Sequence, residues 1–293
     1  MSNVYEWLDA GNNLVGDGAM GTALQDAGLT DGGAPELWNV EHPDLVGAIL
    51  KRYADAGAQY LTTNTFGGTR PRLAMHDLAD RVYELNKAAA EVARDVINSS
   101  DALFVFGDVG PSGELMEPMG LLTPESAQEI FAEQIQGLVD GGVDAILIET
   151  MSDLDEVRAV VAAARHVAPE LPIVATMSFD TNLRTMMGVK PATAITEIAA
   201  MGVRVIGANC GRGTDEMRVI AQDFVDAKPD GIHIVLTSNA GLPQLVGDEF
   251  IYTGSPDDMA EFVSDMHAIG INAFGACCGS NAGHIAAIAR VLS

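Results

Sequence analysis

Cysteine is scarce in this sequence, and no apolar segment is long. The chain has three cysteines among 293 residues, which cannot all pair within one chain and do not make a disulfide-stapled secreted fold. No apolar run reaches the roughly 18 to 20 residues that cross a bilayer. The N-terminal "MSNVYEWLDAGNN" carries acids and amides where a secretory signal carries basic residues and an apolar core. We therefore expect a cytoplasmic protein with reduced thiols and no membrane partner.

Basic residues are also scarce. Sixteen Lys and Arg stand against 41 Asp and Glu, which gives a formal net charge of −25. Such a chain repels a phosphate backbone and has no basic stripe to bind one, so we expect no nucleic-acid partner. The acids are scattered along the sequence and form no tail, which is typical of a solvated acidic surface that favours solubility.

The sequence does contain a repeat, in which a short β-rich apolar run ends at a polar or glycine-containing corner and an amphipathic segment follows. Such segments include 45–56, 82–96 and 127–139, and Pro124, Ser255 or Asp257 lie where helices should begin. The eight apolar runs are 13–18, 58–65, 103–110, 144–150, 172–179, 203–210, 233–241 and 272–279. Apolar runs that alternate with helices indicate parallel strands buried on both faces. Eight such units predict an α/β fold, a (β/α)8 TIM barrel forming a single domain over residues 1–293. An open doubly wound sheet is the alternative, and we assign no dinucleotide site.

In a TIM barrel the active face lies at the C-terminal ends of the strands. All three cysteines fall on this rim, because each follows a predicted strand. The residues at the predicted strand ends are Asp17, Asn64, Asp108, Glu149, Ser178, Asn209 with Cys210, Ser238 with Asn239, and Cys277 with Cys278.

Two adjacent cysteines can converge on one ion only where a strand has ended. Within a regular strand Cys277 and Cys278 would point to opposite faces, and Gly275 and Gly279 permit the bend that brings them together. With Cys210 they make a three-cysteine site, and Zn²⁺ is the ion that such a set of thiolates favours. Three protein ligands with an exchangeable fourth position are typical of a catalytic site. A buried free cysteine can also behave simply as a small hydrophobe.

The motifs around these residues resemble those of the homocysteine S-methyltransferases. This family includes the homocysteine module of cobalamin-dependent methionine synthase, betaine-homocysteine methyltransferase and S-methylmethionine-dependent enzymes. The motifs occur in the family's order across essentially the whole chain: "DGAMGT" (17–22), "TNTFG" (63–67), "ILIETM" (146–151), "GANCG" (207–211), "SNAGLP" (238–243) and "GACCG" (275–279). The resemblance implies a zinc-dependent transfer of a methyl group to homocysteine, with methionine as the product.

The resemblance also implies roles for individual residues. It places a catalytic zinc on Cys210, Cys277 and Cys278, with Asn239 as the oxygen ligand that leaves when substrate arrives. Glu149 would accept the substrate ammonium, a role that its place at a strand end also favours. The backbone of Gly18, Ala19, Met20 and Gly21 offers N–H groups to a carboxylate near a helix start. Asp17 would orient this loop or share the ammonium, and Asn64 and Ser178 are further candidates for substrate contacts.

The methyl donor is not decided by the sequence. We expect no appended folate or cobalamin domain, so the donor comes from outside the chain. Small onium donors call for aromatic rings around the cation, and the candidates near the rim are Trp7, Trp38, Phe66, Tyr252 and Phe274. Trp38, in the long first connection, either covers the barrel mouth or anchors that loop by packing. Gly67 stands where the betaine branch of the family has a tyrosine. The donors that stay open are betaine or another onium compound, S-methylmethionine, and the methylcorrinoid of a separate protein.

Two other functions stay open. One is a barrel lyase or aldolase with Asp or Glu as catalytic groups and structural cysteines. The other is the acceptor module, or a non-catalytic partner, in a multi-protein corrinoid methyltransferase system.

Overall fold

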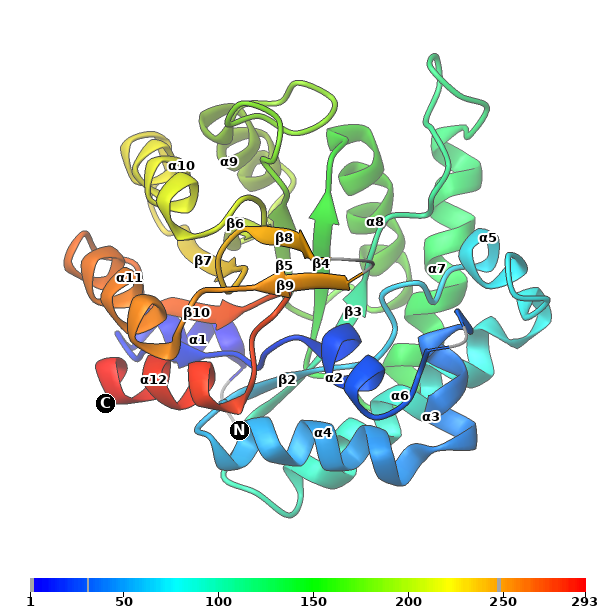
Figure 1. Cartoon of the computed structure of the whole chain (residues 1–293). Helices are drawn as coiled ribbons and strands as arrows, with labels where there is room; N and C mark the ends of the chain where they lie inside the picture. Colours follow the sequence, from blue (N-terminus) through cyan, green and yellow to red (C-terminus); the bar gives the residue numbers. More distant parts are fainter. Residues whose placement is uncertain (1–2, 31, 247–248) are drawn as a thin grey trace.

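The expected barrel is confirmed in a computed structural model, which describes residues 3–30, 32–246 and 249–293. Eight parallel strands form one sheet in the order β1-β10-β7-β6-β5-β4-β3-β2, and helices surround them (Figure 1). The strands are β1 (Leu14–Val15), β2 (Tyr60–Thr62), β3 (Phe104–Val109), β4 (Ala145–Met151), β5 (Ile173–Met177), β6 (Val205–Cys210), β7 (His233–Ser238) and β10 (Ala273–Ala276). Seven of them lie within predicted apolar runs, and β4 extends one residue, Met151, beyond the run 144–150.

The two end strands of the sheet, β1 and β2, are joined by hydrogen bonds of Gln59. Its backbone N–H donates to Val15 O over 2.7 Å, and its side-chain Oε1 accepts from Val15 N over 2.9 Å. Nearer the C-terminal ends, Asp17 accepts from Thr62 N and from Thr62 Oγ1 over 2.7 and 2.9 Å. The barrel is therefore closed partly by side chains, and one of them is a predicted site residue.

The helices begin where the sequence offers caps. Thr123 is the N-cap of the helix that begins at Pro124. Ser255 is the N-cap of a later helix and forms a capping box with Asp258. Asp257 lies inside that helix and is not its cap. The longer helices are α4 (Pro43–Asp55), α6 (Val82–Ile97), α7 (Pro124–Asp140), α8 (Leu154–Val167), α9 (Pro191–Ala200), α10 (Thr214–Ala227), α11 (Pro256–Ala268) and α12 (Ala282–Leu292); the shorter ones are α1 (Val4–Asp9), α2 (Met20–Asp26), α3 (Trp38–Glu41) and α5 (Arg70–Ala74), with 3₁₀ turns at Pro35–Leu37 and Ala79–Arg81. None of the helices in the described parts is long and apolar enough to cross a membrane.

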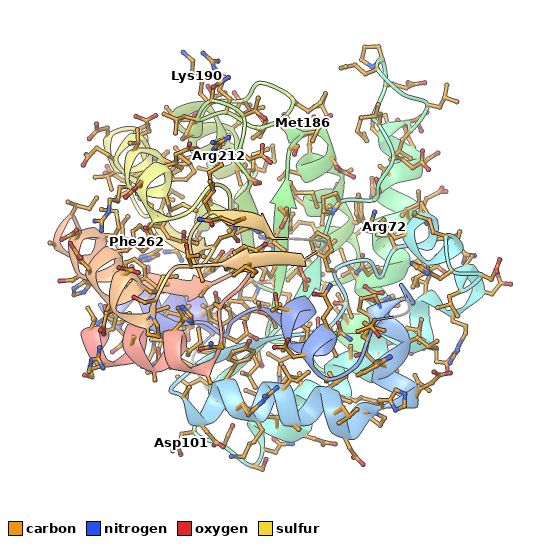
Figure 2. The ribbon with its side chains drawn as sticks, in the orientation of Figure 1. Arg72, Asp101, Met186, Lys190, Arg212 and Phe262 are labelled. Atoms are coloured by element: carbon orange, nitrogen blue, oxygen red, sulfur yellow. The ribbon has the colours of Figure 1, made fainter. Side chains whose placement is uncertain are left out.

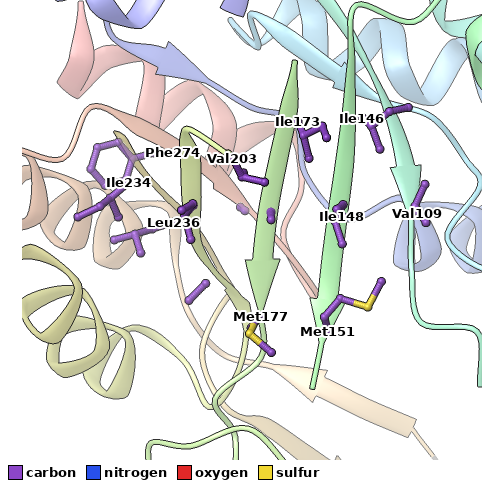
Figure 3. Packing of buried hydrophobic residues seen from close by; sticks show 14 of the residues in the cluster. Val109, Ile146, Ile148, Met151, Ile173, Met177, Val203, Ile234, Leu236 and Phe274 are labelled. Atoms are coloured by element: carbon purple, nitrogen blue, oxygen red, sulfur yellow. The ribbon is translucent and has the colours of Figure 1, made fainter. Parts of the chain in front are cut away.

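The main hydrophobic core lies between the strands and the surrounding helices. Alternate residues of neighbouring strands, such as Ile146, Ile148 and Ile173, point outward into it and are fully buried (Figure 3). A second cluster fills the barrel interior and includes Tyr60 stacked on Phe106 with ring centroids 4.2 Å apart. Burial on both faces explains why the strands are near-continuous apolar runs.

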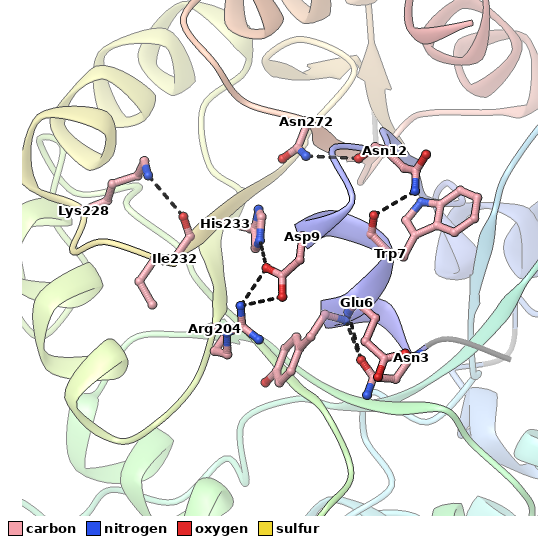
Figure 4. Close-up of polar contacts among 11 residues, drawn as sticks. Asn3, Glu6, Trp7, Asp9, Asn12, Arg204, Lys228, Ile232, His233 and Asn272 are labelled. Carbon is pink, nitrogen blue, oxygen red and sulfur yellow. Dashed lines mark hydrogen bonds and ion pairs between the residues drawn. The ribbon is translucent and has the colours of Figure 1, made fainter.

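Helix α1 covers the N-terminal end of the barrel. Val4 and Leu8 are buried in the interior cluster, and Asp9 accepts hydrogen bonds from Arg204 and pairs with His233 at the starts of β6 and β7 (Figure 4). This end is plugged by side chains, so a ligand has access from the opposite, C-terminal end.

One feature was not expected from the sequence. Between β7 and α11 the chain forms an antiparallel hairpin of β8 (Pro243–Val246) and β9 (Glu249–Tyr252). In Figure 1 it passes across the front of the barrel strands. It leaves β7 at its C-terminal end and therefore lies on the side of the barrel where the predicted site is.

Two glycines provide a matched test of the packing. A Cβ at Gly207 in β6 would lie 1.7 Å from Val235 O of the neighbouring strand, whereas one at Gly47 in α4 would make only ordinary contacts at 3.7 and 3.9 Å. We expect Gly207→Ala to lower the free energy of unfolding by about 3 kcal/mol or more. Gly47→Ala should raise it by about 0.5 to 1 kcal/mol. Denaturant unfolding measures both, and equal effects would contradict the packing described.

Candidate metal centre and active site

A cavity of about 530 Å³ opens at the C-terminal ends of the strands. Residues from the ends of seven strands line it, and the turn between β1 and α2 contributes a continuous stretch, 17–22. This volume is within the usual range for small-molecule sites. The cavity also has chemically distinct regions, which include a group of thiols, a group of carboxylates and a stretch of open backbone amides.

The thiols of Cys210, Cys277 and Cys278 all lie within 4.8 Å of one another. Cys210 ends β6, whereas Cys277 and Cys278 follow β10, which ends at Ala276. The expected end of the strand before the cysteine pair is therefore confirmed. Cys277 Sγ lies 3.9 Å from Cys278 Sγ and 2.8 Å from Cys210 Sγ. A tetrahedral zinc with Zn–S bonds of about 2.3 Å separates its sulfurs by about 3.8 Å, so the set fits zinc once Cys210 Sγ moves outward by about 1 Å.

Backbone turns of unusual geometry place these thiols. Cys210 has a φ of 57°, in the left-handed region that costs a residue with a side chain about 1 kcal/mol or more. Gly211 follows at 71°, and Gly279 has 77° directly after the cysteine pair. Gly279 also has no room for a side chain, because the ring of Tyr252 from β9 packs within 3 Å of where its Cβ would lie.

The buried side chain of Asn209 holds Cys210 in this position. Its Oδ1 accepts from Thr150 N and Thr176 Oγ1, each over 2.8 Å. Its Nδ2 donates to Thr150 Oγ1 over 2.6 Å and to Cys210 Sγ over 3.6 Å. Thr150 has a φ of 58°, also left-handed, at an irregularity in β4. Asn209 was expected only as one of several rim residues, and its network with β4 and β5 could not be read from spacing.

Asn239, the predicted exchangeable ligand, does not line the cavity that holds the thiols; it lines a smaller pocket with Ala240 and Gly241. Its Nδ2 donates to Gly211 O over 2.8 Å, and Ala240 N donates to Cys278 O over 3.0 Å. The residue therefore lies beside two of the predicted cysteine ligands. Within the described residues its buried Oδ1 has no hydrogen-bond partner, and such an orphaned oxygen fits the predicted exchangeable ligand.

Four carboxyl groups line the cavity wall, Asp17, Glu36, Asp108 and Glu149, and burial raises the pKa of each of them. Burial raises the pKa of Glu149 to about 8, and the nearby charges of Asp17 and Cys278 add to the shift. Burial raises the pKa of Asp17 to about 6. Burial, Glu149 and Asp17 together raise the pKa of Asp108 well above its ordinary value. Asp108 Oδ1 also has no hydrogen-bond partner among the described residues. This wall is therefore suited to receive a cation.

The thiols share negative charge. Hydrogen bonds from Cys210 and Cys277 lower the pKa of Cys278 to about 3. The same contacts raise the pKa of Cys277, first through its hydrogen bond with Cys210. Burial and the charge on Cys278 raise the pKa of Tyr252 to about 12. A dication bound among the three thiols would favour their ionisation.

The turn from Asp17 to Gly21 is only partly available for an anion. Ala19 N donates to Ser280 Oγ over 3.1 Å, so this amide is occupied. The amides of Gly18, Met20 and Gly21 have no acceptor in the described parts of the chain. Gly16, Gly18 and Gly21 have the spacing of a dinucleotide-binding loop, but here Gly16 and Gly18 leave room for two tyrosine rings.

Three expected contacts are not placed as the sequence suggested. Asn64 lines the cavity, but its Nδ2 donates to Pro35 O and Asn39 Oδ1 over 2.7 and 3.0 Å, so it holds the first long connection. Ser178 does not line the cavity, because β5 ends at Met177, and Thr176 lines it instead. Trp38 does not line it either. Its ring packs against the main core and edge-on to His42, with centroids 4.8 Å apart.

The chain is similar to known proteins over nearly its whole length. A family model described as homocysteine S-methyltransferase matches residues 14–292. The methionine synthases of Mycobacterium leprae and Mycobacterium tuberculosis are 32% and 33% identical over 295 residues, which cover 96% of this chain and 24% of each relative. The chain thus spans about a quarter of the length of these curated relatives. The metallated form of the homocysteine methyltransferase MmuM from Escherichia coli matches with a TM-score of 0.81 and 22% identity, covering 97% of this chain and 98% of that one. A methyltransferase from Methanosarcina mazei matches with a TM-score of 0.54, 12% identity and coverage of 96% and 93% of the two chains.

The thiol cluster generates a prediction about metal content. The purified protein should hold about one zinc per chain, and Cys210→Ser, Cys277→Ser and Cys278→Ser should each lower zinc occupancy severely, because each removes a thiolate ligand. Elemental analysis after dialysis measures occupancy. Full zinc retention in any of the three variants would contradict the three-thiolate site.

The raised pKa of Glu149 predicts how stability depends on pH. The folded metal-free protein binds this proton more tightly than the unfolded chain does, since the pKa rises from 4.5 to about 8. The free energy of unfolding therefore falls as pH rises through this window. Glu149→Gln removes the free-energy cost of ionising this buried carboxyl group. The variant should therefore be more stable than the wild-type protein by about 1 to 3 kcal/mol at pH 9 in the metal-free state, and this difference should disappear below about pH 4.5. Glu129→Gln, on the exposed side of α7, is the control. A constant difference at all pH values would show that Glu149 is not buried as described.

Proposed function

Because this chain belongs to the homocysteine S-methyltransferase family, we propose that it transfers a methyl group to the thiolate of homocysteine and so forms methionine. The observation that carries the proposal is the arrangement of the cavity wall. Three thiols meet at one place, and carboxylates and open backbone amides line the same cavity. A thiol-bearing amino acid has a thiol for the three cysteines, an ammonium for the carboxylates and a carboxylate for the backbone amides.

The metal proposed for the thiol group is zinc. Cys210, Cys277 and Cys278 would hold it, with Asn239 Oδ1 as the fourth, exchangeable ligand. When bound, the ion supplies a Lewis acid that ionises a substrate thiol at neutral pH. The hydrogen bond from Asn209 Nδ2 to Cys210 Sγ keeps that ligand oriented.

The remaining groups orient the amino-acid part of the substrate. The amides of Gly18, Met20 and Gly21 donate to its carboxylate at the turn that begins α2. Glu149 accepts from its ammonium, and the neighbouring carboxyl groups of Asp17 and Asp108 add negative potential. A Glu149 with a pKa of about 8 is mostly protonated at pH 7 in the empty site, so arrival of the ammonium releases a proton.

A second candidate is the acceptor module of a multi-protein corrinoid system. It is supported by exposed apolar side chains on loops at the C-terminal side of the barrel, where a partner could dock. These are Met75, Leu115, Met119, Leu121 and Met186. The proposed homocysteine chemistry is the same in both candidates. A lyase or aldolase with structural cysteines has no support from the family to which the chain belongs.

Glu149→Gln separates substrate binding from metal binding. The variant should keep its zinc, because no metal ligand changes, and should bind homocysteine about 10- to 100-fold more weakly, because a charged acceptor for the ammonium is lost. Titration calorimetry of the zinc-loaded protein measures the affinity, and Glu129→Gln serves as the surface control. Unchanged affinity would remove Glu149 from the substrate site, and loss of zinc would assign it to the metal instead.

A further inference from the structure

The β8–β9 hairpin has no part in the chemistry proposed so far, although its base is firmly attached to the barrel. Figure 2 shows the hairpin in front of the barrel strands, in the orientation of Figure 1. At its base Tyr252 pairs with Pro243. Just beyond, Gly254 N donates to Ala240 O over 2.8 Å, and His284 Nε2 donates to Gly254 O over 2.9 Å. A side chain at the base of the hairpin therefore has a fixed place relative to the strand ends.

Tyr252 is the residue through which the hairpin contacts the cysteine pair. Its side chain packs on Gly279, where a Cβ would lie 2.1 Å from Tyr252 Cγ. Its hydroxyl forms a hydrogen bond with the thiol of Cys278. A phenol keeps its proton at neutral pH and a thiolate has none, so the hydroxyl is the donor whenever Cys278 is ionised. Cys278 lines the main cavity and Tyr252 does not, so the hydroxyl approaches the sulfur from outside the cavity.

The three thiols differ in the side-chain donors that surround them. Cys210 Sγ accepts from Asn209 Nδ2 over a long 3.6 Å. In the described parts of the chain, the Cys277 thiol has hydrogen bonds with the other two thiols alone. A bound metal ionises these thiols, and they then stop donating to one another. The hydroxyl of Tyr252 still donates, so its bond to Cys278 survives metal binding.

The protein's own thiolates compete with the substrate for the methyl group. All three cysteines line the cavity in which homocysteine is proposed to bind, so an electrophilic methyl compound that reaches the substrate sulfur is also close to them. If Cys278 attacked, its sulfur would bond to the methyl carbon, and the bond to the leaving group would break with its electron pair on that group. An uncharged thioether would then replace an anionic metal ligand. A hydrogen bond to the thiolate opposes this attack, because it stabilises the lone pair that would form the new bond.

We propose that Tyr252 is a positioning residue that acts through Cys278: its hydroxyl bond protects this thiolate from methylation and so directs the methyl group to the substrate thiolate. The inference rests on the proposed function, in which zinc and an electrophilic methyl compound share the cavity with homocysteine. The two parts of the side chain have separate tasks. The ring holds the hairpin against Gly279, whereas the hydroxyl lowers the reactivity of one sulfur and transfers no proton.

Tyr252→Phe tests the hydroxyl and keeps the ring. The zinc-loaded protein is treated with methyl iodide in the absence of homocysteine, and peptide mass spectrometry gives the initial rate of methylation at each cysteine. We expect the variant to be methylated at Cys278 about 10- to 100-fold faster than the wild-type protein, because a hydrogen bond to a charged sulfur is lost. The rates at Cys210 and Cys277 should change less than about twofold. Tyr83→Phe is the matched control, because the hydroxyl of Tyr83 bonds to Asp140 on the exposed surface.

Cobalt(II) in place of zinc provides a spectroscopic readout of the same bond. The sulfur-to-cobalt charge-transfer absorption should shift to lower energy in Tyr252→Phe, because the thiolate lone pair is no longer stabilised by a donor. Tyr83→Phe should leave the absorption unchanged. Metal content should stay near one ion per chain in both variants, since no metal ligand is altered. A purely structural role of Tyr252 predicts no spectral shift, because the phenylalanine ring fills the same space.

Three outcomes overturn the proposal. Equal rates of Cys278 methylation in the wild-type protein and in Tyr252→Phe would reject protection by the hydroxyl. Equal acceleration at all three cysteines would reject it as well, since it would show a general opening of the site. An unchanged cobalt spectrum would show that the hydrogen bond does not act on the metal-bound thiolate. The methylation assay contains no homocysteine, so its failure rejects only the role of Tyr252, whereas failure of the zinc-loaded wild-type protein to bind homocysteine rejects the proposed function itself.

Discussion

The candidate site depends on the C-terminal end of β7, which joins the two strand ends that carry the cysteines. Ser238 O accepts from Cys277 N over 2.9 Å, and Ala240 N donates to Cys278 O over 3.0 Å. On the other side Asn239 Nδ2 donates to Gly211 O over 2.8 Å, next to Cys210. These backbone-directed bonds fix thiols that lie 67 residues apart in sequence on one rim. The oxygen left free on Asn239 is a consequence of the same arrangement, because its amide nitrogen is already used to hold β6.

The electrostatics of the cavity oppose the stability of the empty protein. The charge of Asp17 raises the pKa of Asp108 and of Glu149, and Glu149 raises the pKa of Asp108. Contact with Cys210 and Cys278 raises the pKa of Cys277. Cations relieve this conflict, and the proposed ligands supply them: a metal dication at the thiols and an ammonium at Glu149. Preorganised negative charge of this kind costs folding free energy and is typical of functional sites.

Local patterns in the sequence were sufficient to predict the barrel and its thiol rim. Each of the eight apolar runs coincides with one barrel strand, with β4 ending one residue beyond its run, and the glycines around Cys277 and Cys278 indicated where β10 ends. Contacts between distant segments could not be predicted in the same way. The pairing of Asp17 with Thr62, the network of Asn209 and the occupied amide of Ala19 depend on how neighbouring strands are registered. Ser178 was misplaced because β5 ends one residue earlier than an alternating pattern would require. Of the two roles left open for Trp38, its ring takes the packing one against the core. The β8–β9 hairpin was not among the predicted elements.

The central claim is that three cysteine thiolates hold a zinc that exchanges an oxygen ligand for the sulfur of homocysteine. X-ray absorption at the zinc edge tests it most directly, because the number of sulfur neighbours is read from the metal itself. The account predicts three sulfurs and one oxygen or nitrogen near 2.0 to 2.3 Å in the protein alone, and four sulfurs after homocysteine is added. Fewer than three sulfurs in the free protein, or no change on addition of homocysteine, would contradict it.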